Sequence, residues 1–188
     1  MTLDELFAPT CLQMLGALDG WLEKAQRQRG AEAAERLLAV RLAPDMFPLA
    51  TQVRFACVQA IEGMARLRGE PFPGIAATLR DEGRAAKQLP GTLKEARTRI
   101  AETLAIVRAA RDPQGGADDS RPLSHELPNG MVFDFTAGEY VRDWALPQFY
   151  FHLMAAYAIL RHAGIELGKA DYVAHLFGKL RPGTGPAT

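Results

Sequence analysis

The sequence predicts an all-α protein built as a four-helix bundle, and three observations lead to this expectation. Apolar residues recur near the 3.6-residue helical period in four long segments. Capping residues or helix breakers stand at the ends of these segments. Two long connections separate them, which is typical of bundles with crossover connections. We expect one domain over residues 1–180 and a flexible, Gly- and Pro-rich tail over residues 181–188.

The first helix is expected over residues 3–29. Thr2 and Glu5 have the spacing of a capping box, in which each side chain accepts a hydrogen bond from the other residue's backbone N–H. Gly30 supplies the stop. Pro9 falls in the second turn and leaves two starts open, one near Thr2 and one near the proline itself.

A second long helix is expected from Asp45 to about Arg68. The carboxylate of an Asp that precedes a helix can accept from the free backbone N–H groups of its first turn. Pro48 would then lie within that first turn, where a missing N–H loses no intrahelical bond. A short helix over residues 32–40 is expected to precede this one.

A third long helix is expected from Thr92 to about Arg111. Thr92 and Glu95 again have capping-box spacing, directly after a Pro-Gly pair. The preceding residues 75–89 are ambiguous, and we expect them to be helical in part. Residues 112–122 are rich in Pro, Gly and Asp and predict a surface loop.

The segment LSHELPNGMVFDF predicts a small β-hairpin inserted before the last long helix. Asn129-Gly130, preceded by Pro128, is a strong tight-turn signal, and the flanking residues alternate in part between apolar and polar. We expect this hairpin to be an accessory to the bundle.

The fourth long helix is expected from Pro147 to about Ala163, because proline is well tolerated in a first turn. Residues 136–145 are expected to form a separate short helix before it. Residues 168–180 are expected to form a final short helix.

The charge balance limits the classes of partner. The chain has 22 Lys and Arg against 22 Asp and Glu, whereas nucleic-acid binding needs a basic face that displaces counterions from phosphates. No uncharged run approaches the length of a membrane span, and the N-terminus lacks the basic region of a signal peptide. Cys11 and Cys57 lie among apolar residues, as buried free thiols do in a reducing compartment. We expect a cytoplasmic protein with no nucleic-acid or membrane partner.

The stretch FYFHLMAAYAILRHAG carries polar side chains within an apolar helix. Helical spacing places Gln148 and His152 near one face and Tyr157 near another. If the second and fourth helices touch, Asp45 or Gln52 could meet His152. An unpaired buried imidazole is costly, so we expect His152 to point inward, with a hydrogen-bond partner near these two residues.

Two segments of the chain resemble a known family. LAPDMFPLATQV, LPQFYFHLMAAYAILRHAGIELGK and the following DY are similar to an uncharacterised-domain family of the DinB-like superfamily. The resemblance implies an up-down-down-up four-helix bundle. Many members of the superfamily hold a divalent metal with three histidines, one from the second helix and two that lie four residues apart on the fourth. Some are thiol-dependent transferases or hydrolases, and dimers are common.

The resemblance places His152 where one fourth-helix ligand belongs. Four residues earlier the chain has Gln148, and the second helix has Asp45 and Gln52 but no histidine. A Zn or Ni site needs about three imidazole or carboxylate ligands. We therefore expect no metal or other cofactor; a bound metal, if there is one, would be held by His152 and Asp45. The competing interpretations are a hydrogen-bonded structural His152 and a His–Asp general base.

These observations lead to two hypotheses for function. The first is a homodimer that binds a small molecule or acts as a scaffold, with a polar pocket between the second and fourth helices. The candidate pocket residues are Asp45, Gln52, Gln148, His152 and Tyr157, although a core position with a satisfied hydroxyl also explains Tyr157. The alternative is a metal-dependent thiol transferase or hydrolase that uses His152 with substitute ligands.

Overall fold

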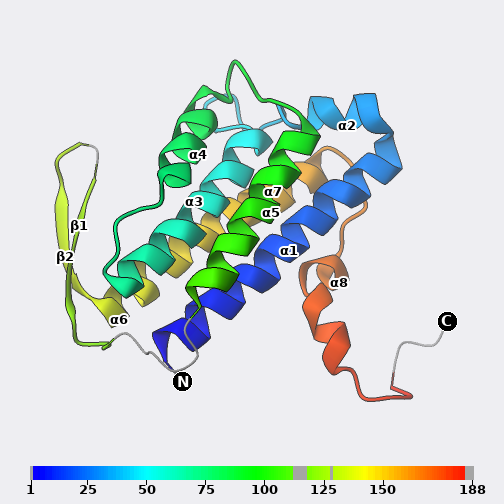
Figure 1. The fold of residues 1–188 in the computed structure, drawn as a ribbon. Helices are drawn as coiled ribbons and strands as arrows, with labels where there is room; N and C mark the ends of the chain where they lie inside the picture. Colours follow the sequence, from blue (N-terminus) through cyan, green and yellow to red (C-terminus); the bar gives the residue numbers. More distant parts are fainter. Residues whose placement is uncertain (1, 112–117, 128, 185–188) are drawn as a thin grey trace.

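The computed structural model describes residues 2–111, 118–127 and 129–184. Its helices and strands follow one another in the order shown in Figure 1. They are α1 (Leu3–Arg29), α2 (Ala31–Leu37), α3 (Leu49–Arg68), α4 (Gly74–Ala85), α5 (Leu93–Ala110), β1 (Pro122–Glu126), β2 (Val132–Thr136), α6 (Ala137–Glu139), the π-helical turn η1 (Tyr140–Ala145), α7 (Leu146–His162), α8 (Lys169–Tyr172) and the 3₁₀ turn η2 (Ala174–Lys179).

The long helices α1, α3, α5 and α7 form the bundle, with α1 and α7 running in one direction and α3 and α5 in the other (Figure 1). The expected up-down-down-up arrangement is therefore confirmed. Two consecutive parallel helices need a long return connection, and the chain between α3 and α5 contains α4. The hairpin of β1 and β2 lies in the second long connection, between α5 and α7.

Local sequence signals fix the start of α1. The Thr2 side chain accepts from the Glu5 backbone N–H at 3.1 Å, and the Glu5 carboxylate accepts from the Thr2 N–H at 2.8 Å. Of the two expected starts, the earlier one is correct. Pro9 lies inside the helix and costs it one intrahelical hydrogen bond.

The helices α1 and α3 approach closely at a glycine. A Cβ atom added to Gly63 would lie 2.2 Å from the ring of Phe7, which is fully buried. Only a residue without a side chain leaves room for this ring. The pair therefore sets the distance between the two helices at this point.

The expected start of the second long helix is wrong. The helix α3 begins at Leu49, and Asp45 lies exposed in the preceding turn without capping it. The reason is a contact with the end of the previous helical segment. The backbone N–H of Leu49 donates to the Val40 carbonyl at 2.9 Å, and that of Ala50 donates to the Leu38 carbonyl at 3.0 Å. Because the chain itself satisfies these two donors, no side-chain cap is needed.

The fourth helix begins earlier than Pro147. Thr136 caps α6 through a capping box with Glu139, and the chain then continues without a break through η1 into α7. In η1 the Leu146 backbone N–H bonds to the carbonyl of Val141, five residues back. This wider turn directly precedes Pro147, which has no N–H to donate. The expected separate short helix is thus the first part of the fourth helix.

The predicted hairpin is present. Its strands pair antiparallel, with Ser124 opposite Asp134 and His125 opposite Phe133. Leu123 and His125 are the buried residues of β1, so this face of the strand packs on the bundle. Gly130 has φ 84°, as a tight turn requires, while the turn residue Pro128 lies outside the described residues.

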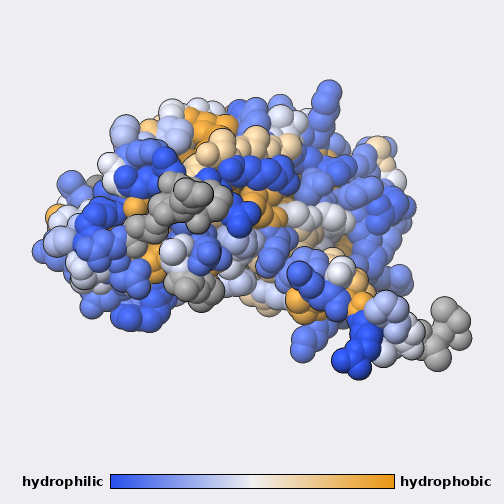
Figure 2. Space-filling view, turned by 60° about the horizontal axis from the view of Figure 1, so that its bottom comes forward, coloured by the Kyte–Doolittle hydropathy of each residue, from blue (hydrophilic) through white to orange (hydrophobic). Residues whose placement is uncertain are grey.

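The C-terminal segment packs on α1. The indole N–H of Trp21 donates to the Asp171 carbonyl at 3.0 Å, and Lys24 forms an ion pair with the Asp171 carboxylate at 2.8 Å. In place of one short helix, the segment forms α8 followed by the 3₁₀ turn η2. Hydrophobic residues lie beside hydrophilic ones on this projecting segment (Figure 2). Residues 185–188 of the expected tail lie outside the described residues.

Candidate functional site

A hydrogen bond between His152 and Gln52 joins α7 to α3. The His152 Nδ1 atom lies 2.8 Å from the Gln52 Oε1 atom. The amide nitrogen of Gln52 donates to the Phe47 carbonyl at 3.3 Å, which leaves its oxygen to accept from the imidazole. His152 therefore carries its proton on Nδ1. The lone pair on Nε2 has no hydrogen-bond donor among the described residues.

Aromatic rings surround this imidazole. Phe55 and Phe151 each place a ring centroid 5.3 Å from that of His152, in edge-to-face geometry. His152 is only 8% exposed. Burial lowers its pKa from 6.5 to about 4, so the ring is neutral at physiological pH.

The structure brings together only part of the predicted site. Gln52 and His152 are in contact, as the helical spacing predicted. Asp45 is exposed in the turn before α3, and it forms no hydrogen bond or ion pair with His152 in the described part of the chain. Gln148 lies one helical turn before His152 and is half-buried. That these residues line a ligand pocket stays a prediction.

Tyr157 belongs to a different cluster. Its ring packs edge-on against Trp21 at 5.3 Å and against Tyr172 at 5.9 Å. These partners come from α1 and α8, whereas His152 contacts α3. Tyr157 lies five positions after His152, which is about 1.4 helical turns, so the two side chains point in different directions.

The residues at the predicted metal position do not form a ligand set. The Nδ1 atom of His152 is bonded to an amide, and Asp45 lies apart from it. Across residues 2–111, 118–127 and 129–184, no group of three or more His, Cys, Asp and Glu side chains is placed to hold a metal ion. Such a site needs about three ligands of these types.

A cavity lies beside α3, where α4, β1 and η1 meet this helix. Its volume is about 670 Å³. Phe55 connects it to the site above, because its ring contacts His152 and also lines this cavity. The lining residues are Phe55, Val58, Gln59, Glu62, Arg66, Phe72, Arg80, Arg84, His125, Glu126, Leu127 and Trp144.

The charged groups of this cavity are unevenly paired. Arg80 forms an ion pair with Glu62. Burial raises the pKa of Glu62, and the opposing effect of the Arg80 charge is smaller. The Arg66 guanidinium lies over the Phe72 ring, 4.7 Å from its centroid. The Arg66 Nε atom is buried and has no hydrogen-bond partner among the described residues.

His125 adds a second unpartnered polar group to the cavity. The residue is 6% exposed, and its Nδ1 atom is buried without a partner in the described chain. Its ring packs against Trp144 at 4.7 Å and Tyr140 at 5.5 Å. Burial lowers the pKa of His125, and the nearby Arg66 charge lowers it further. The imidazole is therefore neutral near pH 7.

Sequence reasoning missed this cavity. Residues 75–89 were ambiguous in the sequence, so the arginines of α4 had no defined direction. One signal was present: Glu62 and Arg66 are four residues apart, as are Arg80 and Arg84, so each pair shares one helix face. The meeting of the two faces depends on how α4 crosses α3.

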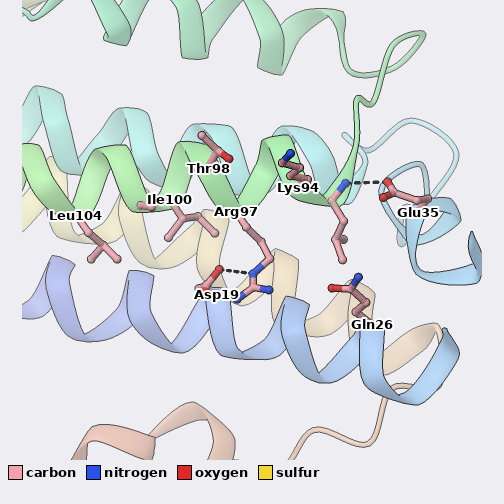
Figure 3. A pocket seen from close by; sticks show the side chains of 10 residues that line it. Asp19, Gln26, Glu35, Lys94, Arg97, Thr98, Ile100 and Leu104 are labelled. Carbon is pink, nitrogen blue, oxygen red and sulfur yellow. Dashed lines mark hydrogen bonds and ion pairs between the residues drawn. The ribbon is translucent and has the colours of Figure 1, made fainter. Parts of the chain in front are cut away.

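A second hollow, of about 530 Å³, lies between α1 and α5 (Figure 3). Two of its polar contacts join neighbouring helices. Arg97 binds the Asp19 carboxylate with contacts of 2.7 and 3.0 Å, and the Leu93 backbone N–H donates to Glu35 at 2.7 Å. These contacts hold the helices together and leave Asp19, Arg97 and Glu35 with partners inside the protein.

Comparisons with known proteins agree with this fold. A family model described as a domain of unknown function (DUF1993) matches residues 3–173. A crystal structure of a DinB family member protein from Shewanella denitrificans is 30% identical, with a TM-score of 0.72. The alignment covers 98% of this chain and 96% of that one. None of the curated proteins matches the sequence. Among the described residues, no helix combines the length and the apolar character needed to cross a membrane.

Proposed function

This chain belongs to the DUF1993 family and has the DinB-like four-helix bundle, and we propose that it is a small-molecule-binding protein. The binding site is the cavity beside α3. Phe55 lines this cavity and also contacts His152, whereas Asp45, Gln52, Gln148, His152 and Tyr157 are not among its lining residues.

The observation that carries this proposal is that two residues lining the cavity each hold a buried polar atom without a partner among the described residues, Arg66 Nε and His125 Nδ1. An unsatisfied buried polar group costs roughly 1–3 kcal/mol. A ligand that bonds to these atoms removes this cost. The volume of about 670 Å³ lies within the range of small-molecule sites, ~300–1,000 Å³.

The test is a screen of small organic molecules for thermal stabilisation of the full chain. Val58 is 3% exposed and lines the cavity, so Val58→Phe places a ring inside it. We expect Val58→Phe to abolish stabilisation by the ligands found. The control Ala105→Phe changes an exposed position of α5 and should leave it intact. Equal stabilisation of Val58→Phe and the unmodified chain would contradict the proposal.

The bundle acts as a homodimer in this proposal. Phe151 is 58% exposed and Met154 is 44% exposed, three residues apart on one face of α7. Large apolar side chains that lie together on a helix surface are typical of protein–protein contacts. A second copy offers the same face, as a two-fold interface requires.

A metal-dependent thiol transferase or hydrolase is the second candidate function. The observation that favours it is the state of His152, whose Nδ1–H is held by Gln52 while Nε2 keeps its lone pair. Metal-binding histidines are commonly oriented by such a bond. This function needs further ligands, and the residues around His152 do not supply them.

A cytoplasmic location is part of the same proposal. Cys11 and Cys57 are buried free thiols, and burial raises the pKa of both. Unpaired, unreactive cysteines of this kind suit a reducing compartment.

A further inference from the structure

We infer that the cavity beside α3 takes a monoanionic carboxylate with a planar apolar body, and that Arg66 and His125 bind its carboxylate. This inference rests on the proposed function, because it names the chemical class of the ligand at the same site.

Arg66 is the cation that is free to bind an anion. Arg80 is committed to Glu62, and Arg84 lies 3.7 Å from Asp81 on the exposed side of α4. Within the described residues, Arg66 forms no ion pair, and its buried Nε has no acceptor. A guanidinium presents parallel N–H donors that match the two oxygens of a carboxylate.

His125 supplies a second donor to the same anion. A neutral imidazole carries one N–H, and its Nδ1 atom is buried without a partner. Both His125 and Arg66 line the cavity, and they are close enough for the Arg66 charge to act on the imidazole. A carboxylate between them would accept from both groups, whereas an ammonium would meet the arginine charge.

The charge of the lining favours one negative charge over two. Arg80 pairs with Glu62, Arg84 pairs with Asp81, and Glu126 is exposed to solvent, so Arg66 is the cation of the lining that has no ion pair among the described residues. A monoanion neutralises this one charge. A phosphate dianion would leave an uncompensated negative charge in a partly buried site.

The rest of the lining is apolar and largely aromatic. Phe55, Phe72 and Trp144 contribute rings, and Val58 and Leu127 contribute aliphatic surface. Flat rings pack well against such walls in stacked or edge-to-face contacts. A planar apolar body attached to the carboxylate therefore fits this part of the cavity.

The test uses 2-naphthoate and its neutral isostere 2-naphthamide as probes in calorimetric titrations of the full chain at pH 7.5. We expect naphthoate to bind at least tenfold more tightly than naphthamide. Arg66→Gln should weaken naphthoate at least tenfold and leave naphthamide within twofold. Arg66→Lys keeps the positive charge but loses the parallel N–H donors of the guanidinium, so its affinity for naphthoate should lie between those of Arg66→Gln and the unmodified chain. Arg108→Gln, at an exposed position of α5, is the matched control and should bind as the unmodified chain does.

The outcomes separate the inference from the proposed function. One outcome is that both probes bind with equal affinity, that Arg66→Gln does not change this affinity, and that Val58→Phe abolishes it. This result would overturn the inference that the ligand is a carboxylate, but it would support the cavity as a binding site. Naphthoate binding that survives Val58→Phe would count against both. No binding of naphthoate at millimolar concentration would overturn the inference, provided that circular dichroism shows the unmodified chain folded.

Discussion

The imidazole of His152 on α7 donates its Nδ1–H to the side-chain oxygen of Gln52 on α3, across 100 positions of the sequence. Edge-on rings of Phe55 and Phe151 flank the pair and exclude most water from it. This contact links the second and fourth helices of the bundle at His152, the residue that the resemblance placed at a possible metal-ligand position.

Replacement of Gln52 by Leu should destabilise the protein. The substitution removes the acceptor of a buried N–H, and an unsatisfied buried donor costs roughly 1–3 kcal/mol. Urea denaturation of the variant should show this loss in the free energy of unfolding. Gln13→Leu makes the same change at an exposed position of α1 and should stay within about 0.5 kcal/mol of the unmodified chain. Equal stability of the two variants would show that the bond contributes nothing.

Stability should fall in acid because of His152. Its pKa is lowered from 6.5 in the unfolded chain to about 4 in the fold, so below pH 6.5 the unfolded state binds the proton first. The loss should begin near pH 6.5, grow to about 3 kcal/mol, and level off near pH 4. Denaturation curves between pH 4 and 8 measure it.

The control for this pH dependence is His162→Gln, at an exposed position of the same helix. This variant should keep the full acid sensitivity. His152→Gln removes one of the two buried histidines with a lowered pKa and should reduce the acid loss between pH 4 and 6.5 by about 3 kcal/mol, while the contribution of His125 remains. Parallel pH profiles for His152→Gln and the unmodified chain would contradict the assignment.

Gly63→Ala should destabilise the bundle by roughly 1–3 kcal/mol, because the added methyl group would meet the ring of Phe7 between α1 and α3. Gly16→Ala is the matched control, since nothing lies within 4 Å of an added Cβ there. In mid-helix this second change should stabilise by about 0.5–1 kcal/mol. Thermal denaturation of both variants should therefore give shifts of opposite sign.

Phe151→Glu should convert the proposed dimer into a monomer, because it places a charge in the centre of the apolar face of α7. Phe177→Glu makes the same change at a residue that is 52% exposed on η2 and should leave the dimer intact. Light scattering at micromolar concentration distinguishes the two masses. A monomeric unmodified chain would remove this part of the proposal.

Protein purified without a histidine tag should hold far less than one equivalent of Zn, Ni or Fe, because His152 is not accompanied by a ligand set. Elemental analysis by mass spectrometry measures this directly. A stoichiometric metal that is lost in His152→Ala would instead support the metal-dependent transferase or hydrolase.

The parts of the fold that depend on neighbouring residues could be predicted from the sequence. The capping boxes of Thr2 with Glu5 and of Thr92 with Glu95 are examples, since all their atoms lie within one turn. The start of α3 could not be predicted. Its first N–H groups bond to the carbonyls of Leu38 and Val40, and the turn that brings these together has no sequence signature.

The part of the candidate site that could be predicted is the contact between two long helices. The contact of Gln52 with His152 followed from helical spacing and from the resemblance of the two segments to one family. The cavity of Arg66 and His125 is different, because α3, a crossover helix and a hairpin strand must meet before it exists. Positions in the sequence do not specify such a three-way packing.

The central claim is that a small molecule binds beside α3, and the two tryptophans of the chain test it directly. Trp144 lines the cavity, whereas Trp21 packs against Tyr157 and Tyr172 on the side of α1 and α8. A ¹H–¹⁵N spectrum resolves their two indole N–H signals, which Trp144→Phe assigns. On titration with 2-naphthoate or 2-naphthamide, the account predicts that the Trp144 signal shifts while that of Trp21 stays in place. A shift of Trp21 alone, or no shift of either signal at millimolar probe, would contradict it.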